Sequence, residues 1–456
     1  MMDTIGDSLS GTAAEWLAGF EKALSEGSAD TLNDLFLPDS HWRDLLALTW
    51  HVTTVSEPAK IAAALCAHMT DAAPSNFRLD ETDAPVRLVM RGGREDVLEA
   101  IYRFETRNGP ATGVVRLLPD DTDGGRLKAW TLLTALESIA GHEETIGTAR
   151  PTGEAYSRDF HGPNWQDRRD IAVAYEDRDP DVLIVGGGQA GVSTAARLTQ
   201  LGADALIVDS NDRVGDNWRN RYHALVLHNQ VHVNHFPYLP FPPNWPTYIP
   251  KDKLAGWFEA YVELMELNFW TGTTFSGGTY DDADGRWTAE LTKADGTVRR
   301  LRPKHIVMAT SVSGIPNIPA IPTLDNFEGK VIHSGKYTGS QDRAGTDVLI
   351  IGTGTSGHDI AQDLHSNGAR PTLVQRSPTL VLNVEPAAQL PYTLYDEGIT
   401  LDTKDLIASS LPLAPLKAAH KWMAEEAARL DADLIDRLEN AGFRIDHDDV
   451  YGWQFK

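Results

Sequence analysis

The sequence predicts an α/β protein with two Rossmann-type dinucleotide-binding domains, preceded by a small α+β domain. The motif Gly-x-Gly-x-x-Gly begins at Gly186 and again at Gly352, and each copy follows a short apolar run and precedes a helical pattern. Over residues 1–140, helical patterns come first and strand patterns follow, which is typical of an α+β domain. The expected divisions are the α+β domain 1–140, a linker 141–180, a first dinucleotide-binding domain 181–340, and a second one with the start of a helical region, 341–456.

Composition excludes several classes of protein. The formal charge of -24 disfavours a nucleic-acid partner, because phosphate contacts need clustered Lys and Arg. Cys66 is the one cysteine, which excludes a disulfide framework, a Cys-x-x-Cys redox pair and a thiolate metal cage. No apolar run approaches the ~20 residues that span a bilayer. We therefore expect a cytoplasmic protein with neither a membrane nor a nucleic-acid partner, whose redox chemistry, if any, belongs to an organic cofactor.

The first domain begins with an amphipathic helix. Thr12 and Glu15 form a capping-box pattern ahead of Trp16 and Phe20, which share one helical face. Two further helical stretches follow, and then four stretches rich in β-formers: 86–90, 97–104, 113–118 and 127–134. This order resembles the small cone-shaped domain of the nuclear-transport-factor and SnoaL-like superfamily. The resemblance implies a domain that dimerises or covers another domain.

Two polar clusters, at 41–44 and 142–144, are predicted to be neither catalytic nor metal-binding. His41, Trp42 and Asp44 could line the mouth of a cone, but we interpret them as a helix start with a cap and a core aromatic. The run at 142–144, His-Glu-Glu, lacks the second histidine of a zinc motif, so no metal site is expected there. The linker that follows is polar, and we expect it to pack on a neighbouring domain through Trp165.

The first glycine loop follows a buried-strand pattern at 181–185. Gly186 permits a tight turn, Gly188 a close approach of backbone to pyrophosphate, and Gly191 close packing of helix on strand. Gln189 and Ala190 open the helix, whose free N–H groups suit phosphate oxygens. The next strand ends at Asp209, close to the ~20-residue spacing at which an acidic side chain meets ribose hydroxyls.

The second loop repeats this pattern with a different ending. Its predicted cofactor-binding residues are those of the turn and the first helical positions, Gly352, Gly354, Thr355, Ser356 and Gly357. The following strand ends in Arg376 and Ser377, where the first unit ended in Asp209. A guanidinium and a hydroxyl can bind a 2'-phosphate that a carboxylate would repel. One such loop is weak evidence, but two in a strand-turn-helix-strand context are strong evidence for two different nucleotides.

Between the loops lies Phe327-x-Gly329-x-x-x-His333-x-x-x-Tyr337, which resembles the fingerprint of flavin-containing monooxygenases. The resemblance implies FAD at the first loop and NADPH at the second, with NADH accepted by some N-terminally extended members. Taken alone, His333 and Tyr337 would be a packed histidine and an aromatic lid; the resemblance implies that they position the cofactors. Tyr at the last position, where Baeyer-Villiger enzymes carry Trp, points to N- and S-oxygenation, although the extended subgroup also oxidises ketones.

Further segments carry the same resemblance. Trp218 and Arg219 lie in a G-x-x-W segment with which the family backs the flavin, although Trp218 could equally be a core aromatic. Asn229 precedes a proline-rich loop and matches the family's active-site asparagine, whereas an Asn in a turn is most often a local cap. Ser311 stands where the family's Ala-Thr-Gly segment has Gly, so the geometry of that hinge is in doubt.

The activity implied is insertion of one oxygen atom from dioxygen into a small soft nucleophile (amine or thioether) or a ketone, through a flavin hydroperoxide. Two alternatives stay open: an NAD(P)H-flavin reductase or oxidase, and a truncated, non-catalytic flavoprotein. The second arises because related chains return to complete the flavin domain, and no return is visible before residues 451–456. We therefore expect 181–340 to be an incomplete flavin domain. The substrate and the oligomeric state, with a homo-oligomer as one option, are left open.

Overall fold

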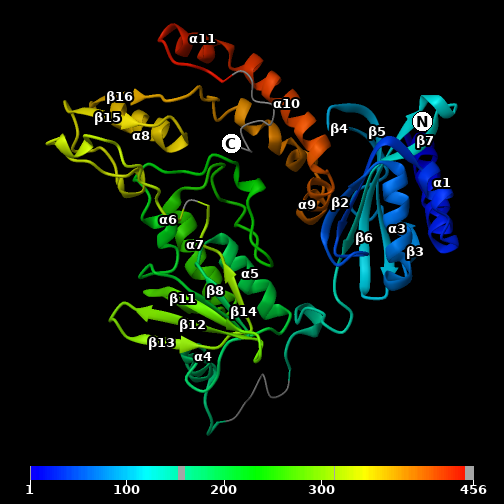
Figure 1. Cartoon of the computed structure of the whole chain (residues 1–456), viewed down its shortest axis with the longest axis horizontal. Helices are drawn as coiled ribbons and strands as arrows, with labels where there is room; N and C mark the ends of the chain where they lie inside the picture. Colours follow the sequence, from blue (N-terminus) through cyan, green and yellow to red (C-terminus); the bar gives the residue numbers. More distant parts are fainter. Residues whose placement is uncertain (1, 153–159, 313, 447–456) are drawn as a thin grey trace. The chain divides into compact units, whose positions relative to one another are not determined.

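The computed structural model describes residues 2–152, 160–312 and 314–446 (Figure 1). Contacts divide the chain into two compact units: unit 1 is Met1–Glu143 with Leu380–Lys456, and unit 2 is Glu144–Thr379. Unit 2 is thus an insertion in the chain of unit 1. The predicted divisions fall at 140, 180 and 340, with a nucleotide-binding domain and the start of a helical region after 341; the helical region groups with the N-terminal part instead. Residues 451–456, on which the expected absence of a return to the flavin domain was judged, lie outside the described residues.

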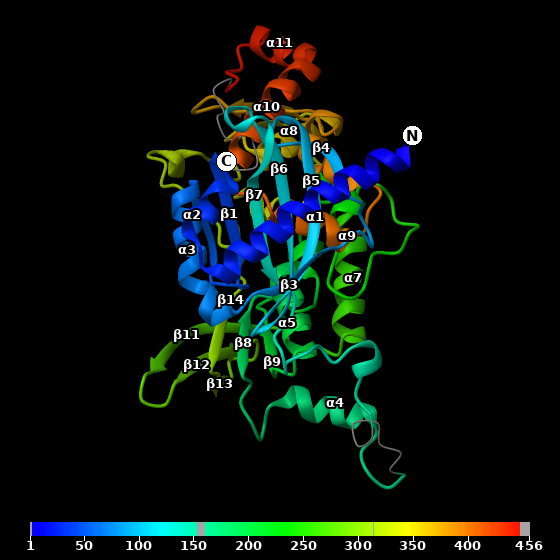
Figure 2. The ribbon, with the colours of Figure 1, turned by 90° about the vertical axis from the view of Figure 1, so that its right-hand side faces the viewer.

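In the N-terminal part of unit 1, three helices pack on one face of a seven-stranded sheet, the face turned toward the viewer in Figure 2. The sheet has the order β2-β1-β7-β6-β5-β3, β4 also pairs with β5, and β1 and β7 are the parallel pair. The elements are α1 (Met2–Glu26), α2 (Ala29–Asp34), α3 (Pro58–Ala72), β1 (Phe36–Leu45), β2 (Val52–Ser56), β3 (Ser75–Leu79), β4 (Arg87–Arg91), β5 (Arg94–Thr106), β6 (Gly109–Asp120) and β7 (Arg126–Leu136).

Side chains alternate across this sheet because successive strand residues point to opposite faces. On β5, Ala100, Tyr102 and Phe104 belong to the core under α1, where the predicted face of Trp16 and Phe20 is buried. The intervening residues of β5 face the other side. There η7 (Ala387–Asp396) and α9 (Leu401–Ser409) of the C-terminal segment pack against them, and α10 (Leu413–Leu430) and α11 (Ala432–Asn440) continue that segment.

The interpretation of His41, Trp42 and Asp44 as the start of a helix is wrong, because all three lie on strand β1. Trp42 is fully buried, and its indole Nε1 donates to Thr134 Oγ1 at 2.9 Å. Asp44 is a cap, as expected, but of the turn after β1: its Oδ2 accepts from the Thr49 amide at 2.8 Å. Pairing with both β2 and β7 decides the conformation of this stretch, and that pairing is not visible in local sequence.

Unit 2 confirms the predicted α/β class. Its parallel sheet has the order β10-β9-β8-β14, and a separate antiparallel sheet has the order β11-β12-β13. The strands are β8 (Val182–Val185), β9 (Ala205–Val208), β10 (Asn268–Trp270), β11 (Thr273–Asp281), β12 (Arg286–Lys293), β13 (Val298–Leu301) and β14 (His305–Met308), and the helices α4 (Trp165–Ala174), α5 (Gln189–Gln200), α6 (Asp216–Arg219) and α7 (Lys251–Leu264). α4 lies within the expected linker, and Trp165 Nε1 donates to Glu266 Oε1 at 2.9 Å.

The second strand-turn-helix-strand pattern also folds as predicted, into β15 (Asp347–Ile351), α8 (Thr355–Ser366) and β16 (Arg370–Val374). β15 and β16 pair in parallel, and α8 packs on Val348 and Ile350. The alternate strand residues, Leu349 and Ile351, are exposed. Short 3-10 turns complete the inventory: η1 (Asp121–Asp123), η2 (Gly147–Ala149), η4 (Val231–Val233), η5 (Leu324–Asn326) and η6 (Ser334–Lys336). Within the described ranges, no helix combines the length and the apolar character needed to cross a bilayer.

Candidate functional site

The first glycine loop joins the end of β8 to the start of α5. Gly186 has φ +109°, and a Cβ there would lie 2.4 Å from the carbonyl oxygen of Ala309. A Cβ at Gly191 would lie 1.9 Å from the carbonyl oxygen of Gly186. Gly188 is the N-cap of α5 and has room for a Cβ, with its nearest neighbour at 3.5 Å. Packing within the protein therefore requires glycine at positions 186 and 191. At position 188 the protein leaves room for a side chain, so a requirement for glycine there would come from a bound ligand.

Asp209 lies beside this loop because β8 and β9 are parallel neighbours whose last residues pair, Val185 with Val208. Its Oδ2 accepts a hydrogen bond from the Gly187 amide at 2.7 Å, and its Oδ1 accepts one from the Asn211 amide at 2.8 Å. Each carboxylate oxygen can accept more than one hydrogen bond. The carboxylate thus fixes the loop and can still receive a ribose hydroxyl. Gln189 and Ala190 are exposed in the first turn of α5.

Trp218, on α6, packs against the core of the parallel sheet. Its indole nitrogen is buried and has no hydrogen-bond partner among the described residues. Leaving a buried N–H unpaired costs about 1–3 kcal/mol, so this N–H is a candidate donor to a bound ligand. Arg219 is engaged by the protein, in ion pairs with Asp216 and, at 3.3 Å, with Glu259.

Asn229 lies in the loop before η4. Its Nδ2 donates to Asn234 Oδ1 at 3.0 Å, so part of its amide holds the local loop together. Ser311, in the altered hinge, has φ +66°, a left-handed conformation that glycine adopts without cost. A serine rarely adopts this conformation, so the hinge holds Ser311 in a backbone geometry typical of glycine.

The second loop repeats the geometry of the first. Gly352 has φ +114°, Gly354 is the N-cap of α8, and a Cβ at Gly357 would lie 2.5 Å from the carbonyl oxygen of Gly352. Thr355 and Ser356 are exposed in the first turn of α8. Arg376 and Ser377 are exposed just beyond the end of β16, the edge toward which the loop opens.

The fingerprint ends inside the second nucleotide fold. His333 caps η6, and its Nδ1 accepts from the Gly335 amide at 3.1 Å. Tyr337 is buried, and its hydroxyl donates to Asp363 Oδ2, on α8, at 2.5 Å. Burial and the Asp363 carboxylate raise the pKa of Tyr337 to about 12. Tyr337 therefore ties the connecting segment to the helix that follows the second loop.

A second contact with α8 is made by residues that belong to no recognised sequence motif. Asp359 accepts a hydrogen bond from the Tyr222 hydroxyl and lies 3.4 Å from His228 Nε2. The hydrogen bond with this carboxylate raises the pKa of His228. Tyr222 and His228 follow the first nucleotide fold, and Asp359 follows the second loop by two residues. The contact joins the two folds, and the residue types alone did not indicate it.

Known proteins resemble part of the chain. The family model described as "Pyridine nucleotide-disulphide oxidoreductase" matches residues 180–435. "Indole-3-pyruvate monooxygenase YUCCA1" of Oryza sativa subsp. japonica is 33% identical over 218 residues, 48% of this chain and 51% of that protein. "Probable indole-3-pyruvate monooxygenase YUCCA10" of Arabidopsis thaliana is 31% identical over 207 residues, 45% of this chain and 54% of that protein. The chain thus spans about half the length of the curated relatives it matches.

Two solved structures are also similar. A flavin-containing monooxygenase from Stenotrophomonas maltophilia shares 24% identity at a TM-score of 0.41, with 51% of this chain and 67% of that chain covered. A closed form of cyclohexanone monooxygenase shares 27% identity at a TM-score of 0.39, with 45% and 39% covered. The family model spans more than half of the chain and both glycine loops. The chain belongs to the pyridine nucleotide-disulphide oxidoreductase family.

Proposed function

We propose that this chain is the catalytic portion of an FAD- and NADPH-dependent monooxygenase. The observation that carries the proposal is the pair of glycine loops with the same backbone geometry and opposite endings, Asp209 at one and Arg376 with Ser377 at the other. The curated relatives are named monooxygenases, which supports the resemblance of the fingerprint to flavin-containing monooxygenases.

The first loop fits FAD on three counts. Gly186 and Gly191 make a cradle that a Cβ would fill, Asp209 can receive a ribose hydroxyl, and Trp218 offers an unpaired buried N–H. When bound, the flavin supplies the redox chemistry and the activation of dioxygen. The protein's part is to fix the pyrophosphate at the N-terminus of α5 and to exclude water through the apolar wall around Trp218.

The second loop fits NADPH. The first turn of α8 offers N–H groups from Thr355 and Ser356 to the pyrophosphate, and Arg376 and Ser377 suit the 2'-phosphate. The contacts of α8 with Tyr222 and Tyr337 hold the two folds together, so the two cofactors keep their relative positions. Asn229 is the proposed polar contact near the reacting atoms.

The proposed substrate is a small soft nucleophile. Tyr337 favours an amine or a thioether over a ketone, by resemblance to the N- and S-oxygenating branch. A reductase with a disulfide relay is disfavoured, because Cys66 is the one cysteine and lies on α3, outside the matched residues 180–435. We also propose a SnoaL-like N-terminal domain and a cytoplasmic location; a homo-oligomer is consistent with such a domain.

The test of this function is spectroscopic and then kinetic. The purified chain should show flavin absorbance near one flavin per protein after incubation with FAD. NADPH oxidation in air should be accompanied by an oxygenated product from an amine, a thioether or a ketone. Flavin binding with NADPH oxidation but without any oxygenated product would favour the reductase, and failure to retain flavin would favour the truncated, non-catalytic alternative.

Arg376→Ala should discriminate between the two nicotinamide cofactors. Losing a charge-assisted hydrogen bond to phosphate costs about 1.5–3 kcal/mol, so the KM for NADPH should rise roughly 10- to 100-fold while that for NADH changes little. Arg370→Ala is the matched control, because Arg370 lies at the opposite end of β16 and pairs with Asp347 at 2.7 Å. Equal losses for NADPH and NADH in Arg376→Ala would remove the cofactor assignment.

A further inference from the structure

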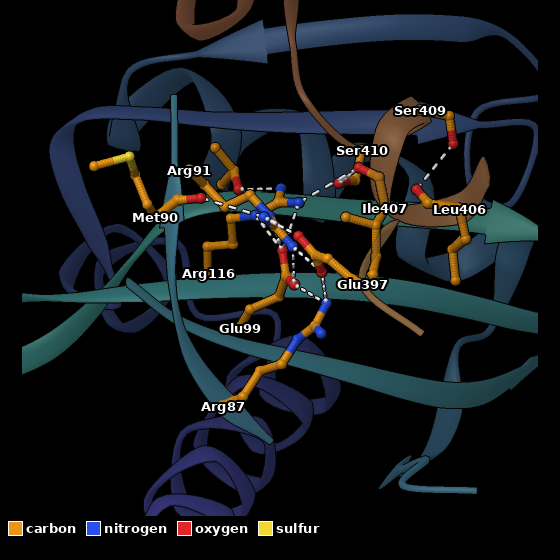
Figure 3. A network of polar contacts seen from close by, with 11 residues as sticks. Arg87, Met90, Arg91, Glu99, Arg116, Glu397, Leu406, Ile407, Ser409 and Ser410 are labelled. Carbon is orange, nitrogen blue, oxygen red and sulfur yellow. Dashed lines mark hydrogen bonds and ion pairs between the residues drawn. The ribbon is translucent and has the colours of Figure 1, made fainter. Parts of the chain in front are cut away.

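Unit 1 contains a cluster of charges that the proposed function does not use (Figure 3). The arginine cluster comprises Arg87 and Arg91 on β4, Glu99 on β5, Arg116 on β6, and Glu397 just after η7. Arg116 and Glu99 are almost wholly buried, with 0% and 2% of their side chains exposed. Burying a charge is costly unless it is paired and hydrogen-bonded, so the composition of this cluster needs an explanation.

The buried half of the cluster is built on a single carboxylate. Glu99 Oε2 accepts from Arg116 Nε at 2.9 Å and from Arg91 Nε at 2.9 Å, and Glu99 Oε1 accepts from Arg87 Nη2 at 3.0 Å. Three guanidinium groups therefore share one carboxylate contributed by the sheet. Within the cluster, the residues of the sheet by themselves carry three positive charges against one negative charge.

Glu397 supplies the second carboxylate from a distant part of the chain. Its Oε1 accepts from Arg91 Nη1 at 2.9 Å and its Oε2 from Arg91 Nη2 at 3.0 Å, the two-pronged geometry in which arginine binds carboxylates. Arg87 Nη2 lies 2.8 Å from the same Oε2. The Glu397 side chain is 26% exposed, so solvent reaches this half of the cluster. Glu397 thus occupies a partly exposed carboxylate position between two arginines.

Next to this position, apolar side chains of the sheet surround Ile407, and the space that Ile407 fills is called the apolar chamber below. Ile407, on α9, is 1% exposed and packs among Ile101, Val114 and Leu133 of the sheet. Arg116 Nη2 donates to the carbonyl oxygen of Ile407 at 3.4 Å, so the charged and apolar parts are contiguous. The C-terminal segment therefore places a carboxylate, that of Glu397, and an aliphatic side chain, that of Ile407, against the sheet. An amphipathic acid carries the same two groups.

We propose that the sheet of unit 1 carries a binding site for a small organic monocarboxylate with an apolar body, and that Glu397 and Ile407 occupy this site as an internal ligand. Arg91 and Arg87 bind the carboxylate, Glu99 and Arg116 hold the two arginines in place, and the chamber around Val114 receives the apolar body. A free acid competes with the C-terminal segment for the site. The ligand class follows from the arginine fork and the adjoining apolar wall.

Chemical rescue tests the proposal in the full chain. Glu397→Ala should lower the midpoint of thermal unfolding by about 5 °C, because Arg91 and Arg87 lose their second carboxylate. Sodium acetate should then restore at least half of that loss in a saturable manner, whereas sodium chloride of equal ionic strength should not. Glu426→Ala is the matched control, since Glu426 also lies in the C-terminal segment and pairs with the exposed Arg429. Acetate should have no such effect on this variant.

The apolar chamber is tested by a second variant. In Glu397→Ala/Ile407→Ala, hexanoate should act at a roughly tenfold lower concentration than acetate, because its chain fills the space that Ile407 leaves. Rescue that chloride reproduces, that Glu426→Ala shares, or that persists in Glu397→Ala/Arg91→Met would overturn the proposal. If Glu397→Ala does not fold, Glu397→Gln preserves the volume, and acetate should raise its unfolding midpoint more than that of wild type; no difference would equally overturn it.

Discussion

Glu99→Gln should lower the unfolding free energy of unit 1 by about 3–5 kcal/mol, the usual cost of breaking a buried ion pair by removing one partner. Three guanidinium groups converge on this carboxylate, and the amide nitrogen of glutamine would face them as a donor. Urea unfolding followed by circular dichroism measures the effect. The control is Glu57→Gln, whose ion pair with Lys60 is exposed and should contribute less than about 0.5 kcal/mol.

The same variant should change how stability depends on pH. Burial raises the pKa of Glu99, but the charges of Arg116, Arg91 and Arg87 outweigh it and hold that pKa at about 2, below the ordinary 4.5. Because the folded-state pKa is depressed, the stabilisation is complete above pH 4.5 and is lost as the pH falls toward 2. The difference between wild type and Glu99→Gln should therefore be constant near neutrality and shrink in acid. A difference that stayed constant down to pH 2 would contradict this assignment.

Gly191→Ala should abolish flavin retention by the first loop. The new methyl group would meet the carbonyl oxygen of Gly186 at 1.9 Å, and neither backbone segment can move away without opening the turn. Overpacking of this kind costs about 1–3 kcal/mol, and the distortion falls on the N–H groups that are proposed to bind the pyrophosphate. The flavin-to-protein ratio after gel filtration, read from visible absorbance, measures the loss.

The control for Gly191→Ala is Gly256→Ala on α7, where a Cβ would have no heavy atom within 4 Å. Because alanine is the better helix former, this variant should keep its flavin and gain about 0.5–1 kcal/mol of stability. Full flavin retention by Gly191→Ala would show that the turn tolerates a side chain and would remove the main argument for a nucleotide cradle at this loop.

The two glycine loops were predictable because their requirements are local. Gly186 and Gly352 have positive φ, and Gly191 and Gly357 pack against a carbonyl oxygen five residues earlier, so a window of a few residues contains the whole signal. The apolar strands on either side add a second local signal. The identity of the cofactors proposed for these loops was predicted from the family resemblance, because the turn geometry is common to many dinucleotide sites.

The features that the sequence did not predict depend on contacts between positions that are far apart in the chain. Arg91 and Glu397 are 306 positions apart, and neither residue lies in a pattern that indicates the other. Strand β1 is another example, because the run around Trp42 takes its conformation from pairing with β7. Tyr337 lies between these cases: its place in a fingerprint was visible in the sequence, but its hydrogen bond with Asp363 was not.

Unit 1 consists of two chain segments separated by the whole of unit 2, and this order affects how the chain folds during synthesis. The strands that carry Arg87, Arg91 and Arg116 leave the ribosome before residues 144–379, whereas Glu397 and α9 follow those residues. At about 5–20 residues per second, the nascent strands wait on the order of ten seconds or more with an unneutralised arginine pair and an open apolar face. We expect the contiguous unit 2 to fold first and the two halves of unit 1 to join last. A fragment ending at residue 143 would be arrested at that waiting stage, exposed to chaperones and prone to aggregate.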